Sequence, residues 1–153
     1  MRIVVMSDSH RAKGNLFEIV EKHMKTTDLF LFLGDGEDDF DEVLMLYPDI
    51  KYDRVCGNCD WYSSYPLYKC IDAGGKKIFF SHGHPFHVKF GYEEIIRESR
   101  LAGADICLFG HTHNQFTEYR NGLYIMNPGS VADGRYGMID IVENGIMLIP
   151  SRI

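Results

Sequence analysis

The chain has 153 residues, of which 45% are hydrophobic and 25% are charged, and its formal net charge at pH 7 is −6. This composition is ordinary for a folded globular protein, and the length corresponds to about one domain, so we expect a single domain over residues 1–153. No apolar run is long enough to cross a bilayer, and the acidic charge opposes binding to a nucleic-acid backbone. We therefore expect no membrane association and no long nucleic acid as a partner.

The N-terminus and the cysteines bear on location. Met1 and Arg2 lead directly into a strand-like apolar segment, without the apolar core or cleavage site of a signal peptide. We therefore expect a cytoplasmic protein. Thiols usually stay reduced there, so we expect the four cysteines of the chain to be free.

The first half of the chain alternates between strand-like and helix-like segments. Strand patterns cover residues 3–6, 28–33 and 51–55, and helical periodicity covers 15–25 and 39–46. Strands that alternate with helices usually pair in parallel. This half therefore predicts a parallel sheet.

The second half changes character. Two strand-like runs, 67–72 and 76–81, are joined by Ala73-Gly74-Gly75, which suits a tight hairpin. A helix is predicted over 92–102, and the further strands are predicted at 105–109, 117–119, 123–126, 137–142 and 146–149. We expect an α/β fold in which two mixed β-sheets form a sandwich flanked by helices.

Side chains that bind metals follow several of the predicted strands. They are Asp8, His10, Asp35, Asn58, His82, His111 and His113. Loops at the carboxyl ends of strands can bring such residues to one centre. Carboxylate, amide and imidazole ligands together suit Mn²⁺, Fe²⁺ or Zn²⁺ better than Mg²⁺. Asp35 is the candidate bridge, because one carboxylate can hold two ions about 4 Å apart.

The order and spacing of these residues resemble a known family. The motifs are Asp8-Ser9-His10, Gly34-Asp35, Gly57-Asn58-Cys59-Asp60, His82-Gly83-His84 and Gly110-His111-Thr112-His113. They resemble the motif series of the calcineurin-like metallophosphoesterases. The short chain, the form of the third motif and Asn127-Pro128-Gly129-Ser130 resemble the small bacterial and archaeal phosphodiesterase branch of that family.

The resemblance covers residues 1 to about 130 and implies a two-sheet α/β sandwich with two divalent ions per chain. It favours manganese, with zinc, iron or nickel as alternatives. By this similarity one ion would be held by Asp8, His10, Asp35 and His113. The other would be held by Asp35, Asn58, His82 and His111.

One position departs from the family pattern. Many members have a histidine directly after the asparagine ligand, where this chain has Cys59. A thiol with its usual pKa of about 8.5 can donate a proton but lacks the charge of a protonated imidazole. Asp60 and His84 are alternative proton donors, or residues that orient Asn58 or His82. The candidate catalytic residues are therefore Asn58, Cys59, Asp60 and His84.

The leading hypothesis is a metal-dependent phosphodiesterase that hydrolyses a small phosphodiester by in-line attack of a hydroxide that bridges two metal ions. A phosphomonoesterase or nuclease with the same site, and a non-catalytic protein-interaction scaffold, are the alternatives. Trp61, Tyr62 and Tyr65 fit an aromatic rim that stacks a base or aryl group, but equally a core or a homo-oligomer interface. The acidic run over 37–42 fits a solvated helix start or a supporting role beside Asp35.

Overall fold

The structure is a computed structural model that describes all 153 residues, and its strands form two five-stranded sheets. The first sheet has the order β10-β9-β1-β2-β3, and the second has the order β4-β5-β6-β8-β7. The strands are β1 (Arg2–Met6), β2 (Leu29–Phe32), β3 (Tyr52–Arg54), β4 (Tyr68–Ala73), β5 (Lys76–Ser81), β6 (Ile106–Leu108), β7 (Phe116–Arg120), β8 (Leu123–Asn127), β9 (Arg135–Val142) and β10 (Gly145–Arg152). The helices are α1 (Lys13–His23), α2 (Glu37–Leu46) and α3 (Glu93–Leu101).

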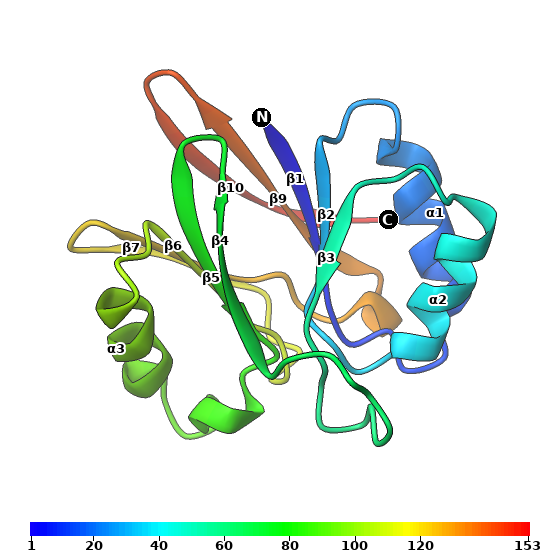
Figure 1. Ribbon diagram of the computed structural model, residues 1–153, viewed down its shortest axis with the longest axis horizontal. Helices are drawn as coiled ribbons and strands as arrows, with labels where there is room; N and C mark the ends of the chain where they lie inside the picture. Colours follow the sequence, from blue (N-terminus) through cyan, green and yellow to red (C-terminus); the bar gives the residue numbers. More distant parts are fainter.

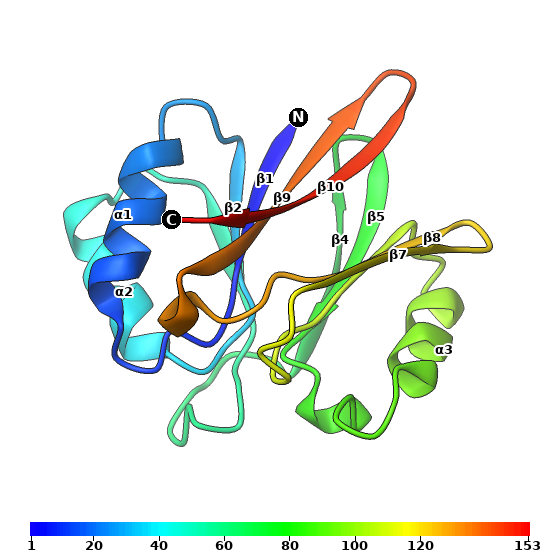
Figure 2. The same ribbon diagram turned by 180° about the vertical axis from the view of Figure 1, so that it is seen from behind.

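The two sheets face each other, with helices on the outside. Helices α1 and α2 cover the outer face of the first sheet, and α3 covers the outer face of the second (Figures 1 and 2). The predicted two-sheet α/β sandwich with flanking helices is therefore confirmed. None of the helices combines the length and hydropathy that a membrane-spanning segment requires.

Both faces of the first sheet are covered at its central strand, β1. Ile3 and Val5 contribute to the core between the sheets, whereas Val4 and Met6 contribute to the core under α1 and α2. Successive side chains of a strand point to opposite faces, so an unbroken apolar run is what a strand with two covered faces requires. A third apolar cluster, which includes Phe79 and Ile95, fixes α3 to the second sheet.

The strand directions place many loops at one edge of the molecule. Strands β1, β2 and β3 pair in parallel, as predicted, and so do β5, β6 and β8 in the other sheet. Both β1 and β5 run to the lower edge of the molecule in Figure 1. The loops that follow the parallel strands of both sheets therefore meet there.

The observed boundaries differ from the predicted ones by a few residues. Helix α2 begins at Glu37 rather than at residue 39, because Gly36, with φ of 147°, breaks the chain direction just before it. Acidic residues fill its first turn, where the helix dipole favours them. Short 3₁₀ helices at His84–Phe86 and Val131–Asp133 were not predicted, because such brief turns leave no periodic pattern in the sequence.

Candidate metal centre

The seven predicted ligands come from loops at the carboxyl ends of strands. Asp8 and His10 follow β1, Asp35 follows β2, and Asn58 follows β3. His82 follows β5 in the other sheet, and His111 and His113 follow β6. The site therefore lies where the two sheets meet at the lower edge of Figure 1.

Two buried carboxylates lie at the centre of the cluster. Asp8 is fully buried, and its Oδ1 lies 3.1 Å from His113 Nε2, 3.6 Å from His10 Nε2 and 3.8 Å from His82 Nε2. Asp35 is 3% exposed, and its Oδ2 lies 3.3 Å from His82 Nε2 and 3.8 Å from His10 Nε2. The imidazole nitrogens thus surround both carboxylates.

Pairs of imidazole nitrogens also face each other. His10 Nε2 lies 3.2 Å from His113 Nε2, and His82 Nε2 lies 3.1 Å from His111 Nδ1. Each contact places two ring nitrogens at one point, which a proton on one of them or a shared cation stabilises. This geometry is that of ligands converging on cations.

The bonding of Asp8 Oδ1 tests whether these residues fit a metal ion. This oxygen is buried and receives no hydrogen bond of normal geometry, despite the nearby imidazole nitrogens. A buried acceptor without a partner costs free energy, and a divalent cation bound to Oδ1 would remove that cost. The donor set of carboxylates and imidazoles is one that Mn²⁺, Fe²⁺ and Zn²⁺ accept. The residues therefore fit a divalent metal centre.

The possible ligands fall into three overlapping groups. Within each group, the donor atoms all lie within 4.8 Å of one another. These groups are Asp8, His10 and His113; Asp35, His82 and His111; and His10, Asp35 and Cys59. Asp35 and His10 each occur in two of them, and Asp35 is the carboxylate of that pair. Asn58 is more peripheral, since its amide donates to Cys59 Sγ at 3.3 Å and forms no hydrogen bond to the other predicted ligands.

The electrostatics of the cluster favour bound positive charge. Burial opposes ionisation of Asp35, but the hydrogen bond and charge of His82 outweigh it, so the pKa of Asp35 is lowered. Burial likewise opposes a charged His82, yet Asp35 and Asp8 raise its pKa. Burial and the charge of His82 lower the pKa of His111 to about 4. His111 is thus neutral at pH 7, the form in which imidazole binds metals.

Most of the ligands lie on unusual backbone. Asp8, His10, Asp35, His111 and His113 all have φ between 44° and 66°, in the left-handed region. Residues other than glycine rarely adopt this conformation, and it concentrates at functional sites. Here it occurs in the loops that follow β1, β2 and β6, which carry these five side chains.

Asp60 fixes the loop that carries Asp35. Its two carboxylate oxygens accept backbone N–H groups of Asp35 at 2.8 Å, Gly36 at 2.9 Å, Glu37 at 3.0 Å and Gly57 at 2.7 Å. Two of these donors also belong to the start of α2, where an anion is favoured. Because every contact uses Asp60 as an acceptor, the arrangement suits a positioning residue better than a proton donor.

The close approach of two loops requires glycine at position 57. A Cβ atom there would lie 2.0 Å from Asp35 Oδ1, which no side chain permits. This close approach allows the backbone N–H of Cys59 to donate to Asp35 Oδ1 at 2.7 Å. The third motif therefore holds the bridging candidate through its backbone as well as through Asp60.

Hydrogen bonds from outside the predicted set orient the other ligands. Ser7 Oγ donates to Asp8 Oδ2 at 2.6 Å, and the carbonyl of Leu33 lies 2.9 Å from His82 Nδ1. Asp39 Oδ2 accepts from Ser9 Oγ at 2.6 Å and from the N–H of Arg11 at 2.8 Å. Of these supporting residues, Asp39 had a signal in the sequence as part of the acidic run beside Asp35, and Ser9 as part of the motif Asp8-Ser9-His10.

The other catalytic candidates lie beside the cluster. Burial and the neighbouring Asp35 carboxylate raise the pKa of the Cys59 thiol to about 11. The ring of His84 lies 5.4 Å from that of His82 and 6.1 Å from that of His111, and burial lowers its pKa. Its Nδ1 is buried without a hydrogen-bond partner. His84 Nδ1 is therefore uncommitted to another polar group, whereas Cys59 Sγ accepts a hydrogen bond from the Asn58 amide at 3.3 Å.

Comparison with known proteins places the chain in a family. The model of the calcineurin-like phosphoesterase superfamily domain matches residues 1–142. The chain therefore belongs to the calcineurin-like phosphoesterase superfamily. It is 31% identical over 132 residues to the probable metallophosphoesterase YsnB of Bacillus subtilis, covering 86% of this chain and 75% of that protein.

Two further relatives match over a shorter stretch. The phosphodiesterase YfcE of Escherichia coli is 30% identical over 104 residues, which cover 59% of this chain and 53% of YfcE. The vacuolar protein sorting-associated protein 29 of Schizosaccharomyces pombe is 33% identical over 98 residues, 63% of this chain and 51% of that protein. The aligned region thus spans about half the length of each.

A solved structure shares the architecture. A predicted phosphoesterase from Streptococcus pneumoniae superposes with a TM-score of 0.79 at 24% identity, covering 98% of this chain and 97% of that chain. At this identity the similarity shows the fold alone. It matches the two mixed sheets with flanking helices described above.

Proposed function

We propose that this protein is a metal-dependent phosphodiesterase that hydrolyses a small phosphodiester. The observation that carries the proposal is the convergence of four imidazoles on the buried Asp8 and Asp35 carboxylates, with Asp8 Oδ1 left without a hydrogen bond. One ion would be held by Asp8, His10, Asp35 and His113, and the other by Asp35, Asn58, His82 and His111. A pair of bound ions supplies a water of lowered pKa and positive charge for the phosphate oxygens.

The surrounding residues prepare these side chains for their role. An N–H on His82 Nδ1 donates to the Leu33 carbonyl at 2.9 Å, which leaves Nε2 free to bind. Asp60 and the N–H of Cys59 fix Asp35 from two sides. Such preorganisation matters because charge that develops during phosphoryl transfer is best stabilised by groups already in place.

The nature of Cys59 supports a diester rather than a monoester substrate. A protonated thiol can donate a hydrogen bond or a proton to an ester oxygen. It carries no positive charge, however. A monoester dianion has one more negative charge than a diester, so it would gain more from the histidine that this chain lacks.

Features of the site count against the two alternatives, a nuclease and a protein-interaction scaffold. The pocket beside the metal centre is lined by five carboxylates, Asp35, Glu37, Asp38, Asp39 and Asp60, which disfavour the polyanionic backbone of a long nucleic acid. The name of the Schizosaccharomyces pombe relative supports a protein-sorting scaffold as the second candidate. A scaffold has no need of ligands, yet all seven predicted ligands are chemically able to bind metal.

The test is hydrolysis of bis-p-nitrophenyl phosphate beside p-nitrophenyl phosphate. The enzyme is treated with a chelator, and Mn²⁺, Zn²⁺, Ni²⁺ or Mg²⁺ is then restored one at a time. We expect turnover of the diester that needs metal, with Mn²⁺ most effective. A preference for the monoester would assign the site to a phosphatase, and bound metal without turnover of either ester would favour the scaffold.

A further inference from the structure

A pocket of about 550 Å³ opens beside the candidate metal centre. It shares His10, Asp35 and Cys59 with the metal-binding groups and continues between the start of α2 and the loop that follows β3. A substrate whose phosphate lies on the metal centre therefore has one continuous space for a substituent. We call it the rim pocket.

Two exposed aromatic side chains line the rim pocket. Trp61 is 85% exposed and Tyr62 is fully exposed. Exposed large aromatic side chains that line one pocket favour a binding site, because a ligand that covers them removes apolar area from solvent. The third aromatic residue of the loop, Tyr65, does not line the pocket. Its hydroxyl accepts a hydrogen bond from Arg54, and its ring lies against the Arg54 guanidinium.

The backbone that carries this aromatic pair is anchored at both ends. On one side Asp60 binds the Asp35 loop and the start of α2, and the N–H of Ser63 donates to the Asp60 carbonyl at 3.1 Å. On the other side the Arg54 guanidinium lies 3.8 Å from the centre of the Tyr65 ring. Trp61 and Tyr62 are thus presented from a fixed segment at the edge of the metal centre.

The charges of the rim pocket select what can lie on the aromatic pair. Glu37 and Asp38 line it, and neither side chain has a hydrogen-bond or ion-pair partner, so both are free acceptors. They repel phosphate, which leaves the metal centre and Arg11 as the anion-binding end of the pocket. A flat, uncharged ring that carries N–H donors matches the acidic, aromatic end.

We propose that the rim pocket binds the nucleobase of a nucleotidyl phosphodiester, stacked on Trp61 and Tyr62, with its amino groups directed to Glu37 and Asp38. This inference rests on the proposed function and adds the substrate class. Hydrolysis then adds one water across the P–O bond, so that phosphorus gains the water oxygen and the leaving oxygen gains a proton. The products are a nucleoside monophosphate and an alcohol.

Trp61 is the only tryptophan of the chain, so its fluorescence reports on the rim pocket directly. We expect adenosine 5′-monophosphate to quench it saturably in the metal-loaded protein. Ribose 5-phosphate, which lacks the base, should bind at least about fivefold more weakly, since stacking of a base on an aromatic side chain accounts for about that factor or more. Uridine 5′-monophosphate, which has no amino group, should bind more weakly than the adenosine nucleotide.

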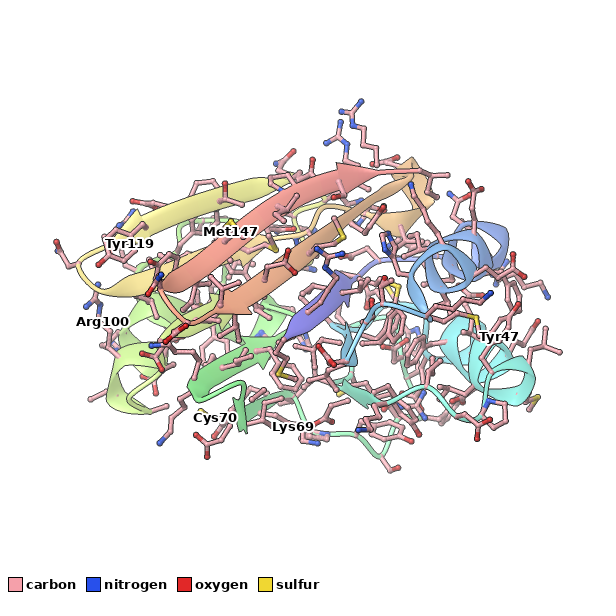
Figure 3. The ribbon with its side chains drawn as sticks, turned by 90° about the horizontal axis from the view of Figure 1, so that it is seen from above. Tyr47, Lys69, Cys70, Arg100, Tyr119 and Met147 are labelled. Atoms are coloured by element: carbon pink, nitrogen blue, oxygen red, sulfur yellow. The ribbon has the colours of Figure 1, made fainter.

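A kinetic experiment separates this inference from the proposed function. The holoenzyme is assayed with adenosine 5′-p-nitrophenyl phosphate and with methyl p-nitrophenyl phosphate. In Trp61→Leu and Tyr62→Leu the ratio of the two kcat/KM values should fall about tenfold. Tyr119→Leu is the matched control, because Tyr119 is an exposed aromatic residue on β7, at the end of the molecule away from α1 and α2 (Figure 3). It should leave the ratio unchanged.

The outcomes are distinguishable. Hydrolysis of both diesters with an unchanged ratio in Trp61→Leu and Tyr62→Leu would overturn the nucleobase site and leave the proposed function intact. Saturable quenching by the adenosine nucleotide without turnover of either diester would support the site and contradict the proposed function. Trp61 fluorescence that depends on protein concentration and not on nucleotide would assign the aromatic pair to a contact between copies of the chain, and would overturn the proposal.

Discussion

The carboxylate of Asp60 binds the backbone of Asp35, whose N–H donates to Asp60 Oδ2 at 2.8 Å. The side chain of Asp35 in turn contacts His82 Nε2 at 3.3 Å. Asp60 therefore controls the position of the proposed bridging ligand without touching a metal-binding nitrogen itself. The same carboxylate satisfies the first amides of α2, so the helix and the site share one anchor.

The first prediction concerns this anchor. Asp60→Asn replaces an acceptor oxygen with an N–H₂ group, which cannot accept the backbone N–H groups and should displace the Asp35 loop. We expect affinity for Mn²⁺, measured by isothermal titration calorimetry, to fall about 10- to 100-fold, the range for residues that orient metal ligands. Glu42→Gln, which changes an exposed partner of Lys13, is the control and should bind Mn²⁺ normally. Unchanged affinity in Asp60→Asn would contradict the role of Asp60.

The second prediction concerns Asp35 itself. Asp35→Asn keeps the size of the side chain but removes the negative charge and one acceptor oxygen. We expect a chain that retains fewer ions, measured by elemental analysis after gel filtration. Metal-dependent hydrolysis of bis-p-nitrophenyl phosphate should fall at least about 100-fold, since a bound ion supplies several kcal/mol and each 1.4 kcal/mol is tenfold. Full turnover in this variant would remove Asp35 from the bridging position.

The fold was predictable where it depends on local pattern. The apolar runs at residues 3–6 and 28–33 and the glycine-rich turn at 73–75 identified strands, a hairpin and the mixed sheets. Strand order was not predictable in the same way. Strand β9 returns to pair with β1 in the first sheet, with Ile3 opposite Ile139, although both β8 and β7 before it lie in the second sheet. Periodicity reports which face of a strand is buried, not which strand lies beside it.

The candidate site was predictable in its residue types but not in its supporting contacts. Asp8 and His113 were identified by their chemistry and by their place after strands. The role of Asp60 depends on a turn that places its carboxylate below the N–H groups of Gly36 and Glu37, and no residue pattern encodes that position. The left-handed backbone of the ligands is likewise invisible in the sequence, because aspartate and histidine usually adopt other conformations.

The third prediction concerns stability against pH. His23 is buried beside Tyr136, with 2.8 Å between Nε2 and the phenol oxygen, and burial together with Lys22 and Arg2 lowers its pKa. Above about pH 6.5 the histidine is neutral in both the folded and the unfolded chain. Below that pH the unfolded chain binds a proton that the folded chain resists, so the free energy of unfolding falls, by at most about 1.4 kcal/mol per pH unit.

His23→Gln keeps a polar group near Tyr136 and removes the titration. Urea unfolding in chelator at pH 7.5 and pH 5.5 should show a smaller loss of stability in this variant than in the original chain. The histidines of the metal centre are common to both proteins, so their contribution cancels in the difference. Equal losses in the two proteins would show that His23 accepts its proton as readily in the fold as outside it.

The fourth prediction concerns Arg54, which connects α2 to the loop of the rim pocket. Its guanidinium is buried, donates to Asp41 at 2.6 Å, donates to the Tyr65 hydroxyl and stacks on the Tyr65 ring. Arg54→Met keeps most of the apolar volume but removes these contacts. Asp41 is partly exposed, so water can solvate it in the variant.

We therefore expect Arg54→Met to lower the free energy of unfolding by about 1.5–3 kcal/mol, the range for hydrogen bonds to charged groups. The loop should also become more mobile, so the fluorescence anisotropy of Trp61 in the folded protein should decrease. Arg97→Met on the exposed face of α3 removes only a surface pair with Glu98 and should change stability by less than about 0.5 kcal/mol. If Arg54→Met loses stability while the anisotropy stays constant, the guanidinium supports the core but not the loop that presents the aromatic pair.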